Sequence, residues 1–413
     1  MNLSLSHTTK VVRGEITLPS SKSISNRALI IKALSGLPFE IENLSTANDT
    51  QILQQLLADK NRTTFDVGHA GTAMRFLTAY LAIQQGEFIL TGSERMQQRP
   101  IRILVDSLRT IGADITYLKN EGFPPLKIIG KTLSGGEITI DGSISSQYIS
   151  ALMMIAPYIK NGLKINFEGQ VASKPYLDMT AEMMKSPTLT LPEGEGIFSH
   201  LGGDKRGGFV VEPDWSAASY WYSMVALAKD AEITLLGLKK KSLQGDSVVA
   251  EIFEKFGVKT DFIENGIRLT KSSDFGLRTS DFQLNFTNCP DLAQTVAVTS
   301  AALNVPSKLT GLSTLRIKET DRIAALQIEL TRLGFNVEVD GDDLIVNRHS
   351  GKSQQLNHWS SISVHTYDDH RMAMAFAPLS LLSPITIENP GVVVKSYPNF
   401  WEDLRSVGVE LKE

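Results

Sequence analysis

The feature that most constrains the fold is a repeat, in which a β-rich stretch runs through a short polar turn into a helix rich in Ala, Ser and Met. The six instances are ITLPSSKSISNRALIIKAL, FDVGHAGTAMRFLTAYLA, ITIDGSISSQYISALMMIA, FVVEPDWSAASYWYSMVALA, LNFTNCPDLAQTVAVTSAAL and ISVHTYDDHRMAMAFAPLSL. Measured between turns, the period is about 70–80 residues, except for the first, which is about 50. Near-equal periods predict repeated structural units, each contributing about two helices and several strands.

The helices of this pattern are apolar on nearly all sides, as expected of buried helices. A second helix pattern alternates with them, is more polar, and often ends at Gly before a β-rich run, as in TDRIAALQIELTRLGFNVEV. The sequence therefore predicts an α/β fold with central helices inside and sheets outside, the inverse of the usual layering. Residues 186–208 are rich in Gly and Pro and are interpreted as a loop or a degenerate repeat.

Composition excludes several classes of function. A chain of 413 residues is too long for one ordinary core, so two to three domains are expected. The net charge of −4 argues against non-specific binding to nucleic acid or to anionic membranes. Cys289 is the only cysteine, which excludes an internal disulfide and a cysteine-based metal cluster. No signal-peptide hydrophobic region or membrane-length apolar run is visible, so we expect a cytoplasmic protein.

Basic residues recur near the starts of these helices, where the helix dipole disfavours them. They are Lys22, Arg27, Arg75, Arg99, Arg316, Lys318, Arg322, His370, Arg371 and Lys395. One basic residue beside a helix start is ordinarily solvated surface, but recurrence at equivalent turns favours a bound anion. Helix N-termini and arginines both bind phosphate or carboxylate. The number of cations indicates more than one anionic group.

Two carboxylates lie among these turns. Asp291 follows CP at a helix start, and Glu319 lies within the basic run RIKETDR. Helix capping and local ion pairing are the ordinary interpretations, and proton transfer is the functional one. His365 and His370 flank two aspartates, but the spacing crosses a strand–turn–helix junction, so no metal site is expected.

The motifs SKSISNR, GHAGTAMR, RMQQRP, DGSISSQY, SKPY, RIKETDR, DDHRMAM and KSYPNF resemble, in order, those of the 5-enolpyruvylshikimate-3-phosphate synthase family. The resemblance covers essentially the whole chain. It implies transfer of the enolpyruvyl group of phosphoenolpyruvate to the 5-hydroxyl of shikimate 3-phosphate, with release of phosphate, in the pathway to chorismate and the aromatic amino acids. It also implies no cofactor and a fold of two domains built from βαβαββ repeats.

The resemblance assigns roles residue by residue. Asp291 is the expected base for the 5-hydroxyl proton, and Glu319 with Lys22 the expected source of the proton for the methylene carbon. The expected shikimate 3-phosphate ligands are Lys22, Ser23, Arg27, Ser145, Ser146, Gln147, Ser173, Tyr176, Asp291, Thr314 and Lys318. The expected phosphoenolpyruvate ligands are Lys22, Gly71, Arg99, Gln147, Arg322, His370, Arg371 and Lys395.

Three positions depart from the family pattern. His69 replaces the usual Asn of GNAGTA, Phe76 replaces a frequent Pro, and Thr314 replaces an Asn expected to contact the shikimate ring. The first departure leaves the shape of the phosphoenolpyruvate pocket, and glyphosate sensitivity, open. The first repeat is short by about 25 residues, which predicts a trimmed periphery with the turn motifs retained.

The resemblance places a first domain at residues 1–19 and 242–413 and a second at 20–241, with crossover strands near 13–20 and 233–243. The alternatives are a UDP-N-acetylglucosamine enolpyruvyl transferase and a catalytically dead anion-binding protein of the same fold. Ser23 stands where the first alternative has Asn, and the loop around Arg99 lacks its usual Cys. We expect a monomer that binds small-molecule substrates, with no nucleic-acid or membrane partner.

Overall fold

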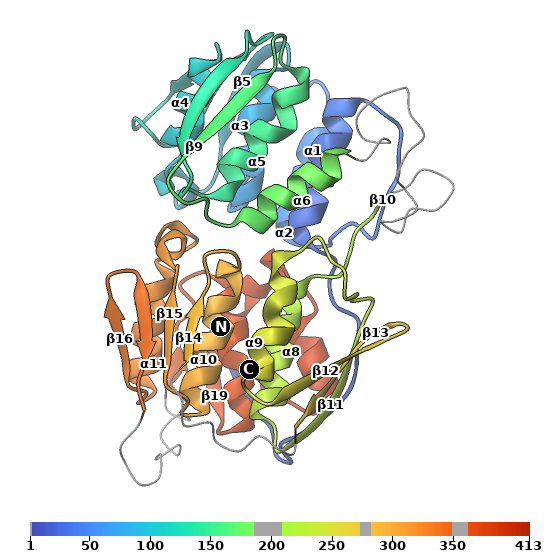
Figure 1. The fold of residues 1–413 in the computed structure, drawn as a ribbon, viewed down its shortest axis with the longest axis vertical. Coiled ribbons are helices and arrows are strands. Elements are labelled where there is room, and N and C mark those ends of the chain that lie inside the picture. Colours follow the sequence, from blue (N-terminus) through green and yellow to red (C-terminus); the bar gives the residue numbers. More distant parts are fainter. Residues whose placement is uncertain (1, 186–208, 273–281, 349–361) are drawn as a thin grey trace. The chain divides into compact units, whose positions relative to one another are not determined.

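The chain forms two compact units. The computed structural model describes residues 2–185, 209–272, 282–348 and 362–413. Residues 186–208, interpreted above as a loop or a degenerate repeat, lie outside this part of the chain. Unit 1 comprises Met1–Pro19 and Pro213–Glu413, and unit 2 comprises Ser20–Glu212 (Figure 1).

Unit 2 is built around three helices that contact one another: α1 (Lys22–Ser35), α3 (Gly71–Ala82) and α5 (Ser146–Ile155). Each has most of its residues buried, as the apolar pattern predicted. The more polar helices of this unit are α2 (Asn48–Ala58), α4 (Arg102–Thr110) and α6 (Lys174–Lys185).

Among the described residues, unit 2 has one complete sheet of four strands and two shorter sheets of two strands each. The complete sheet has the order β4-β5-β7-β6, from β4 (Thr64–Asp66), β5 (Gly86–Thr91), β6 (Asp114–Tyr117) and β7 (Leu126–Gly130). The other two sheets are parallel pairs, β8 (Gly136–Asp141) with β9 (Leu163–Glu168), and β10 (Phe209–Val210) with β3 (Ile41–Glu42). In the first repeat the chain passes from α2 directly to β4 without a hairpin, which accounts for its short period.

Unit 1 has the same plan around α8 (Trp215–Leu227), α10 (Ala293–Ala302) and α12 (His370–Phe376). Every residue of these three helices is buried. Their hydroxyl groups bond between helices: Ser219 Oγ lies 3.0 Å from Thr295 Oγ1, and Ser223 Oγ lies 2.8 Å from Thr299 Oγ1. Small polar residues thus let α8 and α10 pack closely while their buried hydroxyls stay hydrogen-bonded.

Among the described residues, unit 1 contains three four-stranded sheets, and all have the strand pattern of the complete sheet in unit 2. Their orders are β12-β13-β11-β2, β14-β15-β17-β16 and β18-β19-β1-β20. The strands are β1 (Asn2–Ser6), β2 (Val11–Ile16), β11 (Asp230–Leu236), β12 (Val258–Ile263), β13 (Gly266–Lys271), β14 (Phe282–Asn285), β15 (Ser307–Thr310), β16 (Val337–Asp340), β17 (Asp343–Val346), β18 (Ser363–Val364), β19 (Ile385–Glu388) and β20 (Glu410–Lys412). The more polar helices are α9 (Val249–Glu254), α11 (Arg322–Arg332) and α13 (Phe400–Ser406).

The prediction of buried central helices with sheets around them is therefore confirmed within each unit. All six strand–turn–helix segments form as expected, from β2, β4, β8, β10, β14 and β18 into the six central helices. The run YWYSM is core, as Tyr220, Trp221 and Tyr222 are buried. In the described part of the chain, no helix is long and apolar enough to cross a membrane.

The second domain boundary requires correction. It was expected after residue 241, but the structure divides the chain between Glu212 and Pro213. The reason is β11, expected to be part of a crossover, which pairs in parallel with β2 and antiparallel with β13 inside unit 1. The two compact units also divide between Pro19 and Ser20.

Candidate active site

A cluster of charged side chains in unit 1 is built around Arg322, the first residue of α11. Its guanidinium is almost completely buried and bonds three carboxylates. Nε donates to Asp369 Oδ2 over 2.7 Å, Nη2 donates to Glu319 Oε2 over 2.8 Å, and Nη1 donates to Asp291 Oδ1 over 3.1 Å. These carboxylates raise the pKa of Arg322 above its usual range, although burial alone would lower it. The arginine is therefore a fixed cation that holds three turns together.

Asp291 lies between two arginines. It belongs to the 3₁₀ turn η5 (Pro290–Leu292) that leads into α10, and its side chain is 17% exposed. Arg371 Nη2 donates to its Oδ2 over 2.8 Å, opposite the Arg322 bond to Oδ1. Burial alone would raise the pKa of Asp291, but Arg371, Lys318 and Arg322 outweigh burial and hold it well below its usual range. Asp291 is therefore an ionised, partly accessible carboxylate.

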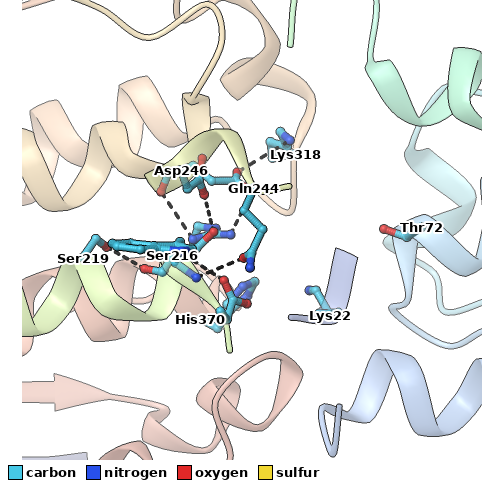
Figure 2. Close-up of polar contacts among 12 residues, drawn as sticks. Lys22, Thr72, Ser216, Ser219, Gln244, Asp246, Lys318 and His370 are labelled. Atoms are coloured by element: carbon cyan, nitrogen blue, oxygen red, sulfur yellow. Dashed lines mark hydrogen bonds and ion pairs between the residues drawn. The ribbon is translucent and has the colours of Figure 1, made fainter. Parts of the chain in front are cut away.

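Lys318 completes this side of the cluster. It follows the 3₁₀ segment η6 (Ser313–Ile317), and its Nζ lies 3.8 Å from Asp291 Oδ1 (Figure 2). Burial lowers the pKa of Lys318, while Asp291 pulls it upward. Thr314 lies on η6, four residues before this lysine.

The start of α12 supplies the remaining groups. Asp369 is its N-cap, has no exposed surface, and accepts from Arg371 N over 2.9 Å while binding Arg322. His370 is buried beside it, with Nδ1 at 3.7 Å from Asp369 Oδ1. Lys395, at the end of η9 (Pro390–Lys395), donates to the carbonyl of Asp368 over 2.5 Å. The turns around Arg322 thus carry most of the residues of unit 1 that the sequence predicted for the active site.

In unit 2, the first turn of α1 carries the second group of predicted residues. Lys22 Nζ lies 3.2 Å from Asp49 Oδ2, in the first turn of α2. Ser23 is partly buried, and its carbonyl accepts from Arg27 Nη1 over 3.0 Å. The sequence around Lys22 contains no acid, and its partner comes from the next helix of the same repeat.

Arg27 is almost completely buried. Its Nε donates to Thr180 Oγ1 over 2.7 Å and its Nη2 to Ser150 Oγ over 2.9 Å, so it joins α1, α5 and α6. Burial lowers its pKa to about 10. The guanidinium also lies over the ring of Tyr176, at 5.8 Å from the centroid. These contacts give Arg27 a structural role, and its contact with substrate stays a prediction.

The start of α5 presents hydroxyl and amide groups. Ser145 is the N-cap, and its side chain accepts from Gln147 N over 3.4 Å. Ser146 is the first helical residue and is nearly buried, and Gln147 Nε2 donates to Thr72 Oγ1 over 3.1 Å. Ser173, just before α6, is buried and has φ of 56°. The serines expected to bind phosphate therefore lie at the N-terminal ends of α5 and α6.

Gly71 and Arg99 are in direct contact. A Cβ built on Gly71, the first residue of α3, would lie 2.6 Å from Arg99 Nη1. Arg75, one turn later, donates to the carbonyl of Gly71 over 3.2 Å and to that of Pro100 over 3.1 Å. His69 Nδ1 lies 3.1 Å from Ser93 Oγ, so the departure at this position is accommodated at the edge of the same turn. The turn motifs that include Lys22 and Arg99 are both present despite the short first repeat.

Several residues of the site were not predicted. Asp49, Asp369 and Tyr220 each contact a predicted cation: Asp49 binds Lys22, Asp369 binds Arg322, and Tyr220 OH accepts from Arg371 Nη1 over 3.4 Å. The signal for Asp369 was its N-cap position in YDDHRM, directly before two predicted residues.

Cys289 is buried and its pKa is raised well above its usual range, mainly by burial, as expected of a packed thiol. Among the described residues, no group of three or more His, Cys, Asp or Glu side chains could hold a metal ion.

Comparisons with known proteins identify relatives of this chain. The family model of EPSP synthase (3-phosphoshikimate 1-carboxyvinyltransferase) matches residues 7–63 and 53–404. A 3-phosphoshikimate 1-carboxyvinyltransferase of Bacteroides fragilis is 48% identical over 404 residues, which are 97% of this chain and 97% of that protein. A protein of the same name from Photobacterium profundum is 38% identical over 423 residues, covering 95% of this chain and 96% of its own.

The solved structure of an EPSP synthase from Acinetobacter baumannii has the same fold, with a TM-score of 0.72, 21% identity and full coverage of both chains. The α/β fold, the charged site and these matches define the class of the protein, which is that of the carboxyvinyl (enolpyruvyl) transferases. Within this class, the chain belongs to the EPSP synthase family.

Proposed function

We propose that this chain transfers the enolpyruvyl group of phosphoenolpyruvate to the 5-hydroxyl of shikimate 3-phosphate. The observation that carries the proposal is the cluster in which Lys318, Arg322 and Arg371 surround the Asp291 carboxylate. Such a cluster places a proton acceptor among cations that bind phosphate and carboxylate groups. Both substrates are multiply anionic, which explains why basic residues recur at the helix starts.

The residues divide by substrate. In unit 1, Arg322, Arg371, His370 and Lys395 bind phosphoenolpyruvate, and Lys318, Thr314 and Asp291 bind shikimate 3-phosphate. In unit 2, Gly71 and Arg99 bind phosphoenolpyruvate, and Ser23, Arg27, Ser145, Ser146, Ser173 and Tyr176 bind shikimate 3-phosphate. Lys22 and Gln147 contact both. The hydroxyls and backbone N–H groups at the starts of α5 and α6 support the assignment of the phosphate.

The addition of the 5-hydroxyl to phosphoenolpyruvate needs two proton transfers of opposite sense. Asp291 removes the proton of the 5-hydroxyl as its oxygen bonds to C2 of phosphoenolpyruvate. Glu319, with Lys22, supplies a proton to the methylene carbon, which forms a tetrahedral intermediate. Loss of a proton from the new methyl group and cleavage of the C–O bond to phosphate then give the enol ether and inorganic phosphate. Cationic side chains fixed in a buried site stabilise the charge that develops.

The charges around Asp291 determine whether proton removal comes before or after binding of phosphoenolpyruvate. Its pKa is held well below the usual range by Arg371, Lys318 and Arg322, although burial alone would raise it. A carboxylate in that state is a weak base. When the carboxylate and phosphate of phosphoenolpyruvate bind Arg322 and Arg371, they neutralise these cations and raise the proton affinity of Asp291. Proton removal therefore follows binding of the donor.

We also expect the chain to act as a cytoplasmic monomer without cofactor or metal.

Phosphate release from phosphoenolpyruvate tests the proposal. We expect turnover with shikimate 3-phosphate, with kcat on the order of 10 s⁻¹, and none with UDP-N-acetylglucosamine. Turnover with the nucleotide sugar instead would assign the alternative transferase. A folded protein that binds both anions and turns over neither acceptor would be the catalytically dead binding protein.

Substituting alanine for Gly71 is expected to weaken binding of phosphoenolpyruvate selectively. The new Cβ would lie 2.6 Å from Arg99 Nη1, so the guanidinium has to move away from its position. Loss of one charged contact corresponds to an increase in KM for phosphoenolpyruvate of about tenfold. The KM for shikimate 3-phosphate should change much less. The matched control is Gly391→Ala, where an added Cβ meets nothing within 4 Å. An unchanged KM for phosphoenolpyruvate in G71A would show that Arg99 does not bind this substrate.

A further inference from the structure

The start of α8 is held by a segment that none of the assigned roles includes. This segment is Gln244–Asp246, which comprises the N-cap and the first two residues of the 3₁₀ turn η4 (Gly245–Val248). Gln244 Oε1 accepts from Trp215 N over 3.0 Å, and its Nε2 donates to the carbonyl of Pro213 over 2.8 Å. The amide of Gln244 thus bonds the backbone on both sides of Asp214, the N-cap of α8.

Asp246 makes the second connection. It is 2% exposed, and its Oδ2 accepts a hydrogen bond from Ser216 Oγ in the first turn of α8 (Figure 2). Its other oxygen, Oδ1, is buried and has no hydrogen-bond partner among the described residues. A buried carboxylate with one unsatisfied oxygen is costly, whereas a neutral carboxylic acid is much less so.

The first turn of α8 leads directly to the charged cluster. Tyr220 follows Ser216 by four residues, so both side chains lie on the same face of the helix. The hydroxyl of Tyr220 accepts from Arg371 Nη1, and Arg371 binds Asp291. A chain of contacts therefore runs from Asp246 through Ser216 and α8 to Arg371 and the proposed base.

We propose that Asp246 is a positioning residue of the active site, which acts in its neutral form by fixing the start of α8 beside the Arg371–Asp291 pair. The inference rests on the proposed enolpyruvyl transfer. The ionisable groups that act on Asp246 are Asp291, Arg371 and Asp214, and Cys289 lies near it with its thiol un-ionised. Burial, and then the charge of Asp291, raise the pKa of Asp246 to about 7, while the bond from Ser216 and the charge of Arg371 act in the opposite direction.

Ionisation of Asp246 would place a second negative charge near Asp291. That charge would compete for Arg371 and repel the anionic donor, so KM for phosphoenolpyruvate should rise as pH increases through about 7. A bound donor disfavours this ionisation, so kcat should change less than KM. A purely structural role for Asp246 would produce no such pH dependence.

The test is the pH profile of kcat/KM for phosphoenolpyruvate in Asp246→Asn, which mimics the neutral acid. We expect the ratio of D246N to wild type to increase about tenfold between pH 7 and pH 9, through KM. Ser216→Ala removes a hydrogen bond that lowers the pKa of Asp246. The decline of kcat/KM with rising pH should therefore occur at higher pH in this variant. Asp230→Asn, at an exposed aspartate of β11, is the matched control and should retain the wild-type profile. Coincident profiles for D246N and wild type would overturn the proposal.

An infrared measurement gives a readout that does not need activity. Wild-type protein at about pH 6 should show the carbonyl band of a protonated carboxyl group that D246N lacks, and the band should disappear as pH rises through about 7. If no turnover is found with shikimate 3-phosphate, the proposed reaction fails, and this band still decides the state of Asp246. Absence of the band would show an ionised Asp246 and refute the inference.

Discussion

Replacing Asp291 with asparagine should lower kcat about 10³-fold while leaving the protein folded. The substitution keeps the shape of the side chain but removes its ability to take a proton. Asparagine can still accept from one arginine, so we expect the substrates to bind with affinities within about tenfold of wild type. The measurements are phosphate release at saturating substrates and calorimetric titration with shikimate 3-phosphate.

The control for this variant is Asp340→Asn, an exposed aspartate at the end of β16, which should retain wild-type kcat. Stability is measured in parallel by chemical denaturation. Because the folded-state pKa of Asp291 lies below its unfolded value, its charge stabilises the fold above about pH 4 and this contribution is lost as pH falls. D291N should therefore be less stable than wild type at pH 7, and the difference should shrink in acid. A D291N variant with more than a tenth of wild-type kcat would exclude Asp291 as the base.

The repeat made the architecture predictable. Burial of a helix on all sides requires apolar or small residues throughout, and this pattern is visible in a single sequence. The strand–turn–helix segments could therefore be located along the chain from the pattern of residues alone, together with the turns that carry Lys22, Asp291 and Arg371. Anion binding at those turns is a prediction from the sequence, because cations at helix starts conflict with the helix dipole unless an anion is bound.

Contacts between distant segments were not predictable in this way. Asp246 bonds Ser216 across 30 residues, and β2 pairs with β11 across more than 200. Neither pairing leaves a periodic signal, because a single buried carboxyl or a strand register is specified by the partner and not by the local sequence. The same limit explains the boundary after Glu212, which depends on the sheet that β11 joins. For Arg27, the sequence motif predicted contact with substrate but gave no sign of its partners within the fold. In the structure its guanidinium donates to Ser150 and Thr180.

Substituting methionine for Arg322 should cause a large loss of stability, in addition to abolishing activity. Arg322 is 1% exposed and joins Asp291, Glu319 and Asp369. Methionine fills much of the same volume but leaves these carboxylates without their shared cation. Removing one partner of a buried ion pair costs about 3–5 kcal/mol. We expect the free energy of unfolding of unit 1 to fall by about that amount, measured by urea denaturation at pH 7.

The matched control is Arg316→Met, the same substitution six residues earlier. Arg316 is 35% exposed and pairs with Asp321 and Asp342 at the surface. Exposed ion pairs contribute up to about 1 kcal/mol, so R316M should be nearly as stable as wild type. Arg322→Lys keeps the charge but cannot reach three carboxylates at once, and its stability should be intermediate.

The pH dependence of R322M separates electrostatics from packing. Without Arg322, the three ionised carboxylates repel one another, so the variant loses stability as the pH rises above about 4 and these groups become charged. Lowering the pH towards 4 protonates these groups and should bring R322M closer to wild type. A stability difference that stays constant over this range would instead show that the cost comes from lost packing around α11. It would then follow that Arg322 is held in place for its shape, and that the three carboxylates do not need its charge to coexist in one site.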